Sequence, residues 1–180
     1  MKSCRLYILI LTVMAFSLSQ VTLYAQRKSI GCSFSYTGIS LDYEHYLQNE
    51  DTFLNIQLRA ETEEMNMSRS SYPGISASAN WNFVIRQWST PENNAIKLFA
   101  GPGVVVGYTQ DFKTRDGLLF GLKVRIGAEC CFNRNVTLSA CIAPVLGVNA
   151  TVDDDSVIVK YYRNGLQFAL IPEIGIKYRF

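Results

Sequence analysis

The chain has 180 residues, of which 48% are hydrophobic and 12% aromatic, and it carries 17 basic and 15 acidic side chains. This balance lacks the basic excess of a nucleic-acid-binding protein, so we expect no nucleic-acid partner. Ten tyrosines and ten phenylalanines beside only five prolines favour a β-protein.

Residues 1–25 have the layout of a secretory signal peptide. Two basic residues precede an apolar stretch that is too short for a membrane-spanning helix, and a more polar exit follows. We predict cleavage between Ala25 and Gln26, which leaves residues 26–180 as one exported domain. The mature chain is then neutral, because the leader removes two bases and no acid.

Eight segments of the mature chain alternate between apolar and polar residues. Successive side chains of a strand point to opposite faces, so this alternation predicts strands with one apolar face. Several segments exceed the length of about 9–11 residues that a membrane-crossing barrel strand needs. The predicted strands are residues 28–36, 39–47, 52–63, 72–87, 95–108, 117–132, 135–148 and 166–180.

The connections alternate between short turns and longer polar loops, as in bacterial outer-membrane barrels with an even strand count. The sequence therefore predicts an all-β fold, an antiparallel up-and-down transmembrane β-barrel of eight strands. A rival interpretation joins residues 28–47 into one bent strand and gives seven strands, an odd number that conflicts with this topology. The long outer loops are expected at residues 64–71, 109–116 and 149–156.

The polar parity of these strands collects charges of both signs. A barrel of eight strands has a lumen just wide enough for side chains to fill, and charges in so narrow a space must pair. We therefore expect a closed, salt-bridged lumen rather than a pore. The predicted lumen network is Asp42, Glu44, Arg59, Glu61, Arg86, Lys97, Lys123, Arg125, Glu129, Glu173, Lys177 and Arg179.

The apolar parity would contact lipid, and aromatic residues near both strand ends predict two interfacial girdles. An alternative is a soluble periplasmic ligand-binding barrel, in which the same two faces would be inverted. The alternation alone does not decide between them. Strand length and the terminal Phe180 favour the membrane interpretation.

With its leader, its long alternating strands and its terminal Tyr178-Arg179-Phe180, the chain resembles small outer-membrane barrels of the OmpX and OmpA-barrel type. It looks closest to outer-membrane proteins of Bacteroides-like bacteria. The resemblance implies a location in the cell outer membrane, contact with lipopolysaccharide, and insertion by the barrel-assembly machinery. That machinery would read a signal formed by Tyr178 and Phe180.

The sequence offers little for catalysis. His45 is the single histidine, it lies on the apolar parity, and no serine stands two places from it. Nucleophile motifs and metal-ligand clusters are missing, so we expect no enzyme, no metal and no cofactor. The expected role is structural or surface interaction, as a monomer, with an extracellular partner bound by the outer loops. Residues 157–162 have high β-propensity and could expose a strand edge there. A lipid A-modifying enzyme and a small channel stay as alternatives.

Overall fold

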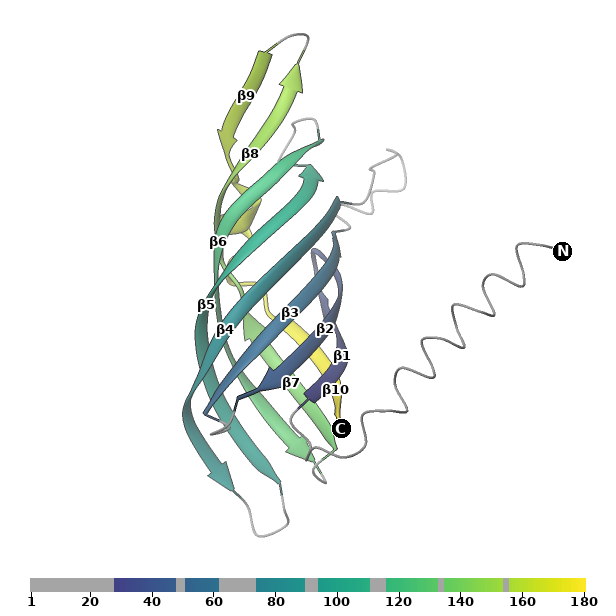
Figure 1. Cartoon of the computed structure of the whole chain (residues 1–180), viewed down its shortest axis with the longest axis vertical. Coiled ribbons are helices and arrows are strands. Elements are labelled where there is room, and N and C mark those ends of the chain that lie inside the picture. Colours follow the sequence, from purple (N-terminus) through teal and green to yellow (C-terminus); the bar gives the residue numbers. More distant parts are fainter. Residues whose placement is uncertain are drawn as a thin grey trace, which may run out of the picture.

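A computed structural model shows a closed antiparallel β-barrel from which one hairpin projects (Figure 1). The structure describes residues 28–47, 51–61, 74–89, 94–110, 116–132, 135–153 and 156–180. The predicted leader and its cleavage site at Ala25 and Gln26 lie outside these residues. No helix in the described part of the chain is long and apolar enough to cross a membrane.

Ten strands and one short helix make up the described chain. The strands of the first half are β1 (Lys28–Ser35), β2 (Gly38–Tyr46), β3 (Thr52–Glu61), β4 (Gly74–Ser89) and β5 (Ala95–Gln110). The second half contains β6 (Asp116–Phe132), β7 (Val136–Ile142), β8 (Val145–Asp153), β9 (Ser156–Tyr161), α2 (Asn164–Gln167) and β10 (Glu173–Arg179). The expected separation of the first two strands is confirmed, since β1 and β2 pair as a tight hairpin.

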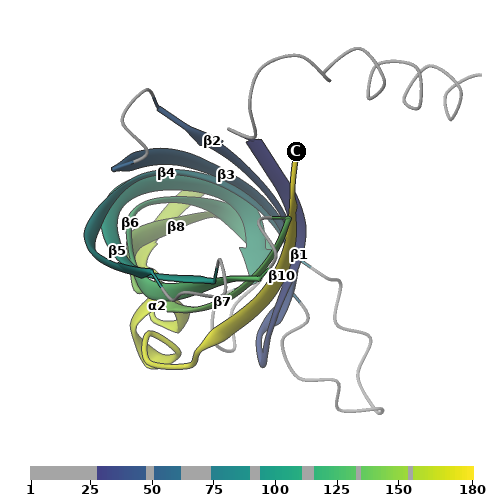
Figure 2. The same cartoon turned by 90° about the horizontal axis from the view of Figure 1, so that it is seen from below.

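Nine of these ten strands form an eight-stranded wall, and β9 pairs with β8 alone. Neighbouring strands pair from β1 through β6, β7 follows β6, and β10 closes the ring by pairing with both β7 and β1 (Figure 2). β7 and β8 lie in the same register along β6 and form one wall strand, interrupted at Ala143 and Pro144. Proline has no backbone N–H to donate to a ladder, which explains the interruption.

Two sequence predictions at the end of the chain were wrong. The last strand begins at Glu173 rather than at residue 166, and residues 164–172 form α2 and turns. The predicted loop at residues 149–156 is instead the tip of the β8–β9 hairpin, which pairs from Val148↔Tyr161 to Asp153↔Ser156. β8 continues the wall beyond Pro144, but β9 occupies its second edge from Val148 onward, and β1 ends at Ser35. Residues 166–172 therefore form no ladder with either neighbour.

The polar side chains of the strands face the lumen and the apolar side chains face outward, as the membrane interpretation requires. Most polar side chains of β2, β3 and β6 are buried in the lumen, whereas the alternating aliphatic residues point outward. Leu122, for example, is 63% exposed on the outside of β6, and its neighbour Lys123 is 4% exposed inside. The inverted arrangement of a soluble ligand-binding barrel is therefore contradicted. Aromatic residues exposed on the exterior include Tyr36, Trp81, Phe83, Tyr108, Phe132 and Tyr178.

Candidate functional site

A network of buried ion pairs fills the middle of the lumen. Lys177 of β10 donates to Glu44 of β2 at 2.6 Å and to Glu129 of β6 at 2.5 Å. Arg125 of β6 lies 3.3 Å from the same Glu44 carboxylate. All four side chains are at most 1% exposed. Each charge therefore has an opposite partner, as burial in so narrow a space demands.

Neutral polar side chains extend this network toward the hairpin end of the barrel, the end at which β8 and β9 project. Asp42 accepts hydrogen bonds from Ser33 at 2.5 Å and from Asn55 and Gln57 at 3.2 Å each. Gln57 also donates to Glu173 at 3.2 Å. These bonds join β1, β2, β3 and β10 from inside the wall.

A second group of contacts lies nearer the hairpin end. Arg59 forms an ion pair with Glu173 and donates to Ser35 and Thr37 beside the β1–β2 turn. On the same strand, Glu61 accepts hydrogen bonds from Ser76 and from the Tyr162 hydroxyl, at 3.1 Å and 3.3 Å. Tyr162 follows β9, so this bond attaches the chain between β9 and β10 to the wall.

Aromatic rings pack together at the opposite end of the lumen. Tyr46 stacks on Phe53 at 5.0 Å between centroids, and Phe99 meets Phe53 edge-on at 5.4 Å. Cations lie against this group: Arg179 is 4.4 Å from the centroid of the Tyr46 ring, and Lys97 is 5.0 Å from it. Sequence analysis missed this cluster because it treated the inner parity as polar. The sequence did contain a signal for this cluster: aromatic residues stand on the inner parity at the ends of neighbouring strands. Tyr46 and Phe53 are such a pair, since they lie opposite each other on β2 and β3.

Arg86 is a correction to the predicted lumen network. A bulge between Val84 and Arg86 shifts the register of β4 against β5, so that Arg86 pairs with the outward residue Leu98. Side chains alternate with a period of two, and one extra residue therefore moves every later side chain to the other face. Arg86 is exposed and lies 5.0 Å from the centre of the Trp88 ring.

The remaining predicted residues lie apart from the network. Tyr178 is half exposed on the outside of β10, and Phe180 exchanges backbone hydrogen bonds with Lys28 at the barrel seam. His45 is partly buried on the outer parity between Lys28 and Leu54, which are its neighbours on β1 and β3. No group of three or more metal-binding side chains occurs among the described residues.

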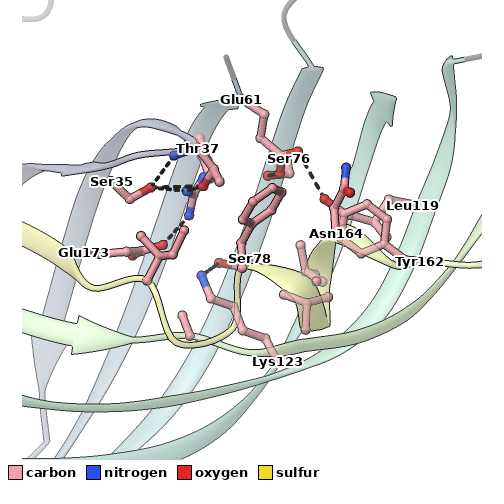
Figure 3. Close-up of a pocket in the computed structure, with 17 residues that line it drawn as sticks. Ser35, Thr37, Glu61, Ser76, Ser78, Leu119, Lys123, Tyr162, Asn164 and Glu173 are labelled. Atoms are coloured by element: carbon pink, nitrogen blue, oxygen red, sulfur yellow. Dashed lines mark hydrogen bonds and ion pairs between the residues drawn. The ribbon is translucent and has the colours of Figure 1, made fainter. Parts of the chain in front are cut away.

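A recess of about 70 Å³ opens in the hairpin half of the lumen (Figure 3). Its polar side carries the cations Arg59 and Lys123, the carboxylates Glu61 and Glu173 and several hydroxyl groups, and its apolar side includes Leu119 and Tyr162. The chain that connects β9 to β10, including α2, covers part of it. Sequence alternation did not predict this recess, because the covering segment was assigned to a strand.

The β8–β9 hairpin is the other feature open to a partner. Among the described strands, β9 pairs with β8 alone, so its second edge has no strand beside it. Val152, Val157 and Val159 are 71%, 68% and 61% exposed, and Tyr161 is half exposed. The hairpin therefore combines a free backbone edge with an exposed apolar face.

No family model matches the chain, and no curated protein matches it either. Among solved structures, the chain is similar to Neisserial surface protein A, with 14% identity and a TM-score of 0.42 over 85% of this chain and 93% of that one. It is also similar to the Yersinia pestis outer membrane protein Ail, with 17% identity and a TM-score of 0.39 over 85% and 97%. These likenesses are remote, so the role of the protein has to be inferred from the chain's own geometry. The resemblance to Bacteroides-like proteins stays a prediction.

Proposed function

We propose that this protein is a non-enzymatic outer-membrane β-barrel with a role in surface interaction. The observation that carries the membrane location is the orientation of the two strand faces. Leu41, Leu58, Val104, Leu122 and Ile176 are each at least half exposed on the outside of the wall. Soluble monomers rarely expose so extensive an apolar surface, whereas lipid is its natural surrounding.

The interior supports a structural rather than a conducting role. Ion pairs among Glu44, Arg125, Glu129 and Lys177 span the middle of the lumen, and the aromatic cluster occupies the end opposite the hairpin. The lumen of an eight-stranded barrel is just wide enough for side chains to fill. The described side chains leave a recess of only about 70 Å³ in it. Tyr178 and Phe180 lie at the seam where β10 pairs with β1, a position that suits a signal read by the barrel-assembly machinery. Lipopolysaccharide would surround the outer surface of the barrel.

The β8–β9 hairpin is the part of the barrel that we assign to surface interaction. From Phe132 to Leu118, β6 climbs about 35 Å along the barrel axis, given a rise of about 3.3 Å per residue and a tilt of about 40°. The apolar band of a membrane barrel is about 25 Å tall. With the lower edge of this band at Phe132, the hairpin beyond Leu118 stands above it. An exposed edge in water recruits a partner strand, and Val157 and Val159 add apolar contact.

Binding of cells to immobilised host-surface or matrix proteins tests this role. Cells that display the wild-type barrel should be retained, and the double variant Val157→Lys, Val159→Lys should lose most of this retention. Gln87→Lys with Ser89→Lys is the matched control, because it adds two charges to exposed positions at the other end of the barrel. Equal retention of all three would remove the hairpin from the proposal, and no retention of any would remove adhesion.

A further inference from the structure

We propose that the recess in the hairpin half of the lumen is a binding site for a short-chain monocarboxylate, with the carboxylate on Lys123 and the alkyl tail on Leu119. This site is separate from the hairpin edge and does not depend on it. Three features of the recess carry the inference: a buried ammonium group with an unused donor, an adjacent apolar wall, and a volume that suits few atoms.

Lys123 has only neutral hydrogen-bond partners, whereas Arg59, Arg125 and Lys177 each form an ion pair. Its ammonium donates to Gln57 Oε1 at 2.5 Å and to Ser78 Oγ at 3.2 Å, both of them neutral groups. No carboxylate among the described residues lies within ion-pair distance of it, whereas the other three cations each have one. An ammonium group has three donors, so one donor of Lys123 is unused.

Gln57 explains why Lys123 is left without a carboxylate partner. The Gln57 amide accepts from Lys123 on its oxygen and donates from its nitrogen to Glu173. It therefore stands between the two charges, and Glu173 is committed to Arg59 instead. A buried charge without a contact partner costs several kcal/mol, and an anion that enters the recess would reduce this cost. Two carboxylates also line the recess, but both have partners: Glu173 is paired with Arg59, and Glu61 accepts from Ser76 and Tyr162. Arg59 adds a second cation, and its Nε has no hydrogen-bond partner.

The other wall of the recess is apolar. Leu119 is 1% exposed and packs with Val105 and Tyr162, and Val145 lies against this group. These residues line the same recess as Lys123 (Figure 3). A ligand with a charged end and a short hydrocarbon end matches both walls, whereas a bare inorganic anion would leave the apolar wall without a partner.

The volume limits the size of the ligand. Pockets for drug-sized molecules measure roughly 300–1,000 Å³, and this recess measures about 70 Å³. It has room for a few heavy atoms and not for an acyl chain of a membrane lipid. We therefore choose butyrate as the probe, with butyramide as its uncharged counterpart and acetate as its shorter homologue.

The test measures the unfolding temperature of the purified mature barrel in detergent micelles with each probe at equal ionic strength. Butyrate should raise this temperature by a few degrees above the value in sodium chloride. Butyramide should not raise it, and acetate should raise it less than butyrate does. Equal effects of chloride, acetate and butyrate would indicate a bare anion site and would overturn the proposal, as would the absence of any butyrate effect.

Two variants locate the effect. Lys123→Met removes the ammonium group at similar length, and Leu119→Trp fills the recess while it keeps an apolar side chain. Both should abolish the butyrate response, and Lys160→Met, at an exposed position on β9, should retain it. If Lys123→Met does not fold, Leu119→Trp still decides the question. A full butyrate response in Leu119→Trp would contradict the site.

Discussion

Lys177 in the last strand donates a hydrogen bond of 2.5 Å to Glu129 in β6, past β7, the strand that separates them. The same ammonium lies 2.6 Å from Glu44 in β2, on the other side of the closing seam. One lysine thus joins strands on both sides of the place where the sheet closes into a barrel. Through the lumen, Lys177 thus connects β10 with β2 and with β6.

Lys177→Met should destabilise the barrel by about 3–5 kcal/mol, because it leaves Glu44 and Glu129 with less compensation in a buried site. Urea unfolding in detergent, followed by tryptophan fluorescence, measures the loss. Arg86→Met is the control, since Arg86 is exposed and should change the free energy of unfolding by less than about 0.5 kcal/mol. Adding Glu129→Gln to Lys177→Met should cost less than Glu129→Gln alone. Additive costs would argue against a coupled network.

Gly31→Ala should impair closure of the barrel. Gly31 pairs with Lys177 across the seam, and a Cβ there would lie 2.2 Å from the Ile176 carbonyl oxygen and 2.6 Å from Lys177 Cγ. The backbone must move to relieve this contact, at a cost of about 1–3 kcal/mol or more. The folded fraction after refolding into micelles checks it. Gly121→Ala, whose nearest atom would be at 2.9 Å, should refold better, and equal yields would contradict the seam geometry.

Leu122→Arg should lower the stability of the barrel in a bilayer by about 2–4 kcal/mol, because the side chain faces outward within the apolar belt. Gln87→Arg, at an exposed position near the end of β4, should have little effect. Unfolding in phospholipid vesicles measures both variants. If Leu122→Arg is as stable as the wild type, lipid does not contact this face.

The wild-type barrel should not conduct ions across a planar bilayer. Phe53 and Phe99 are fully buried in the lumen, and Arg125 and Lys177 are held in ion pairs beyond them. Single-channel recording with heat-denatured protein as control measures this. Steady current steps from the native protein alone would favour the small-channel alternative.

Much of the barrel follows from alternation, because a period of two determines which face each side chain takes. The alternation put Glu44 and Lys123 on one face and Leu122 on the other, and strand length favoured the polar face as the inner one. The structure shows Glu44 and Lys123 inside and Leu122 outside. It failed at Arg86, where a bulge changes the register without any mark in the hydrophobic pattern. A single extra residue is a local event that alternation does not record.

The end of the chain shows a second limit. Residues 166–172 alternate as a strand does, but a strand needs a free edge to pair with. β9 occupies the second edge of β8 from Val148 onward, and β1 ends at Ser35. The segment instead forms α2 and turns, and the Phe168 ring lies 6.4 Å from that of Tyr36. The recess depends on this segment. It could not be predicted because it requires the tertiary arrangement of residues from several strands.

In our account, the chain forms a closed barrel whose apolar face contacts lipid. Electrophoresis of the outer-membrane fraction, before and after boiling, tests this directly. A closed membrane barrel resists dodecyl sulfate until it is heated, so the unboiled protein should migrate at a different position from the boiled protein. We expect this shift, with the protein in the membrane fraction. A protein that stays in the aqueous fraction and shows no shift would not be a membrane barrel, and its apolar face would need another partner.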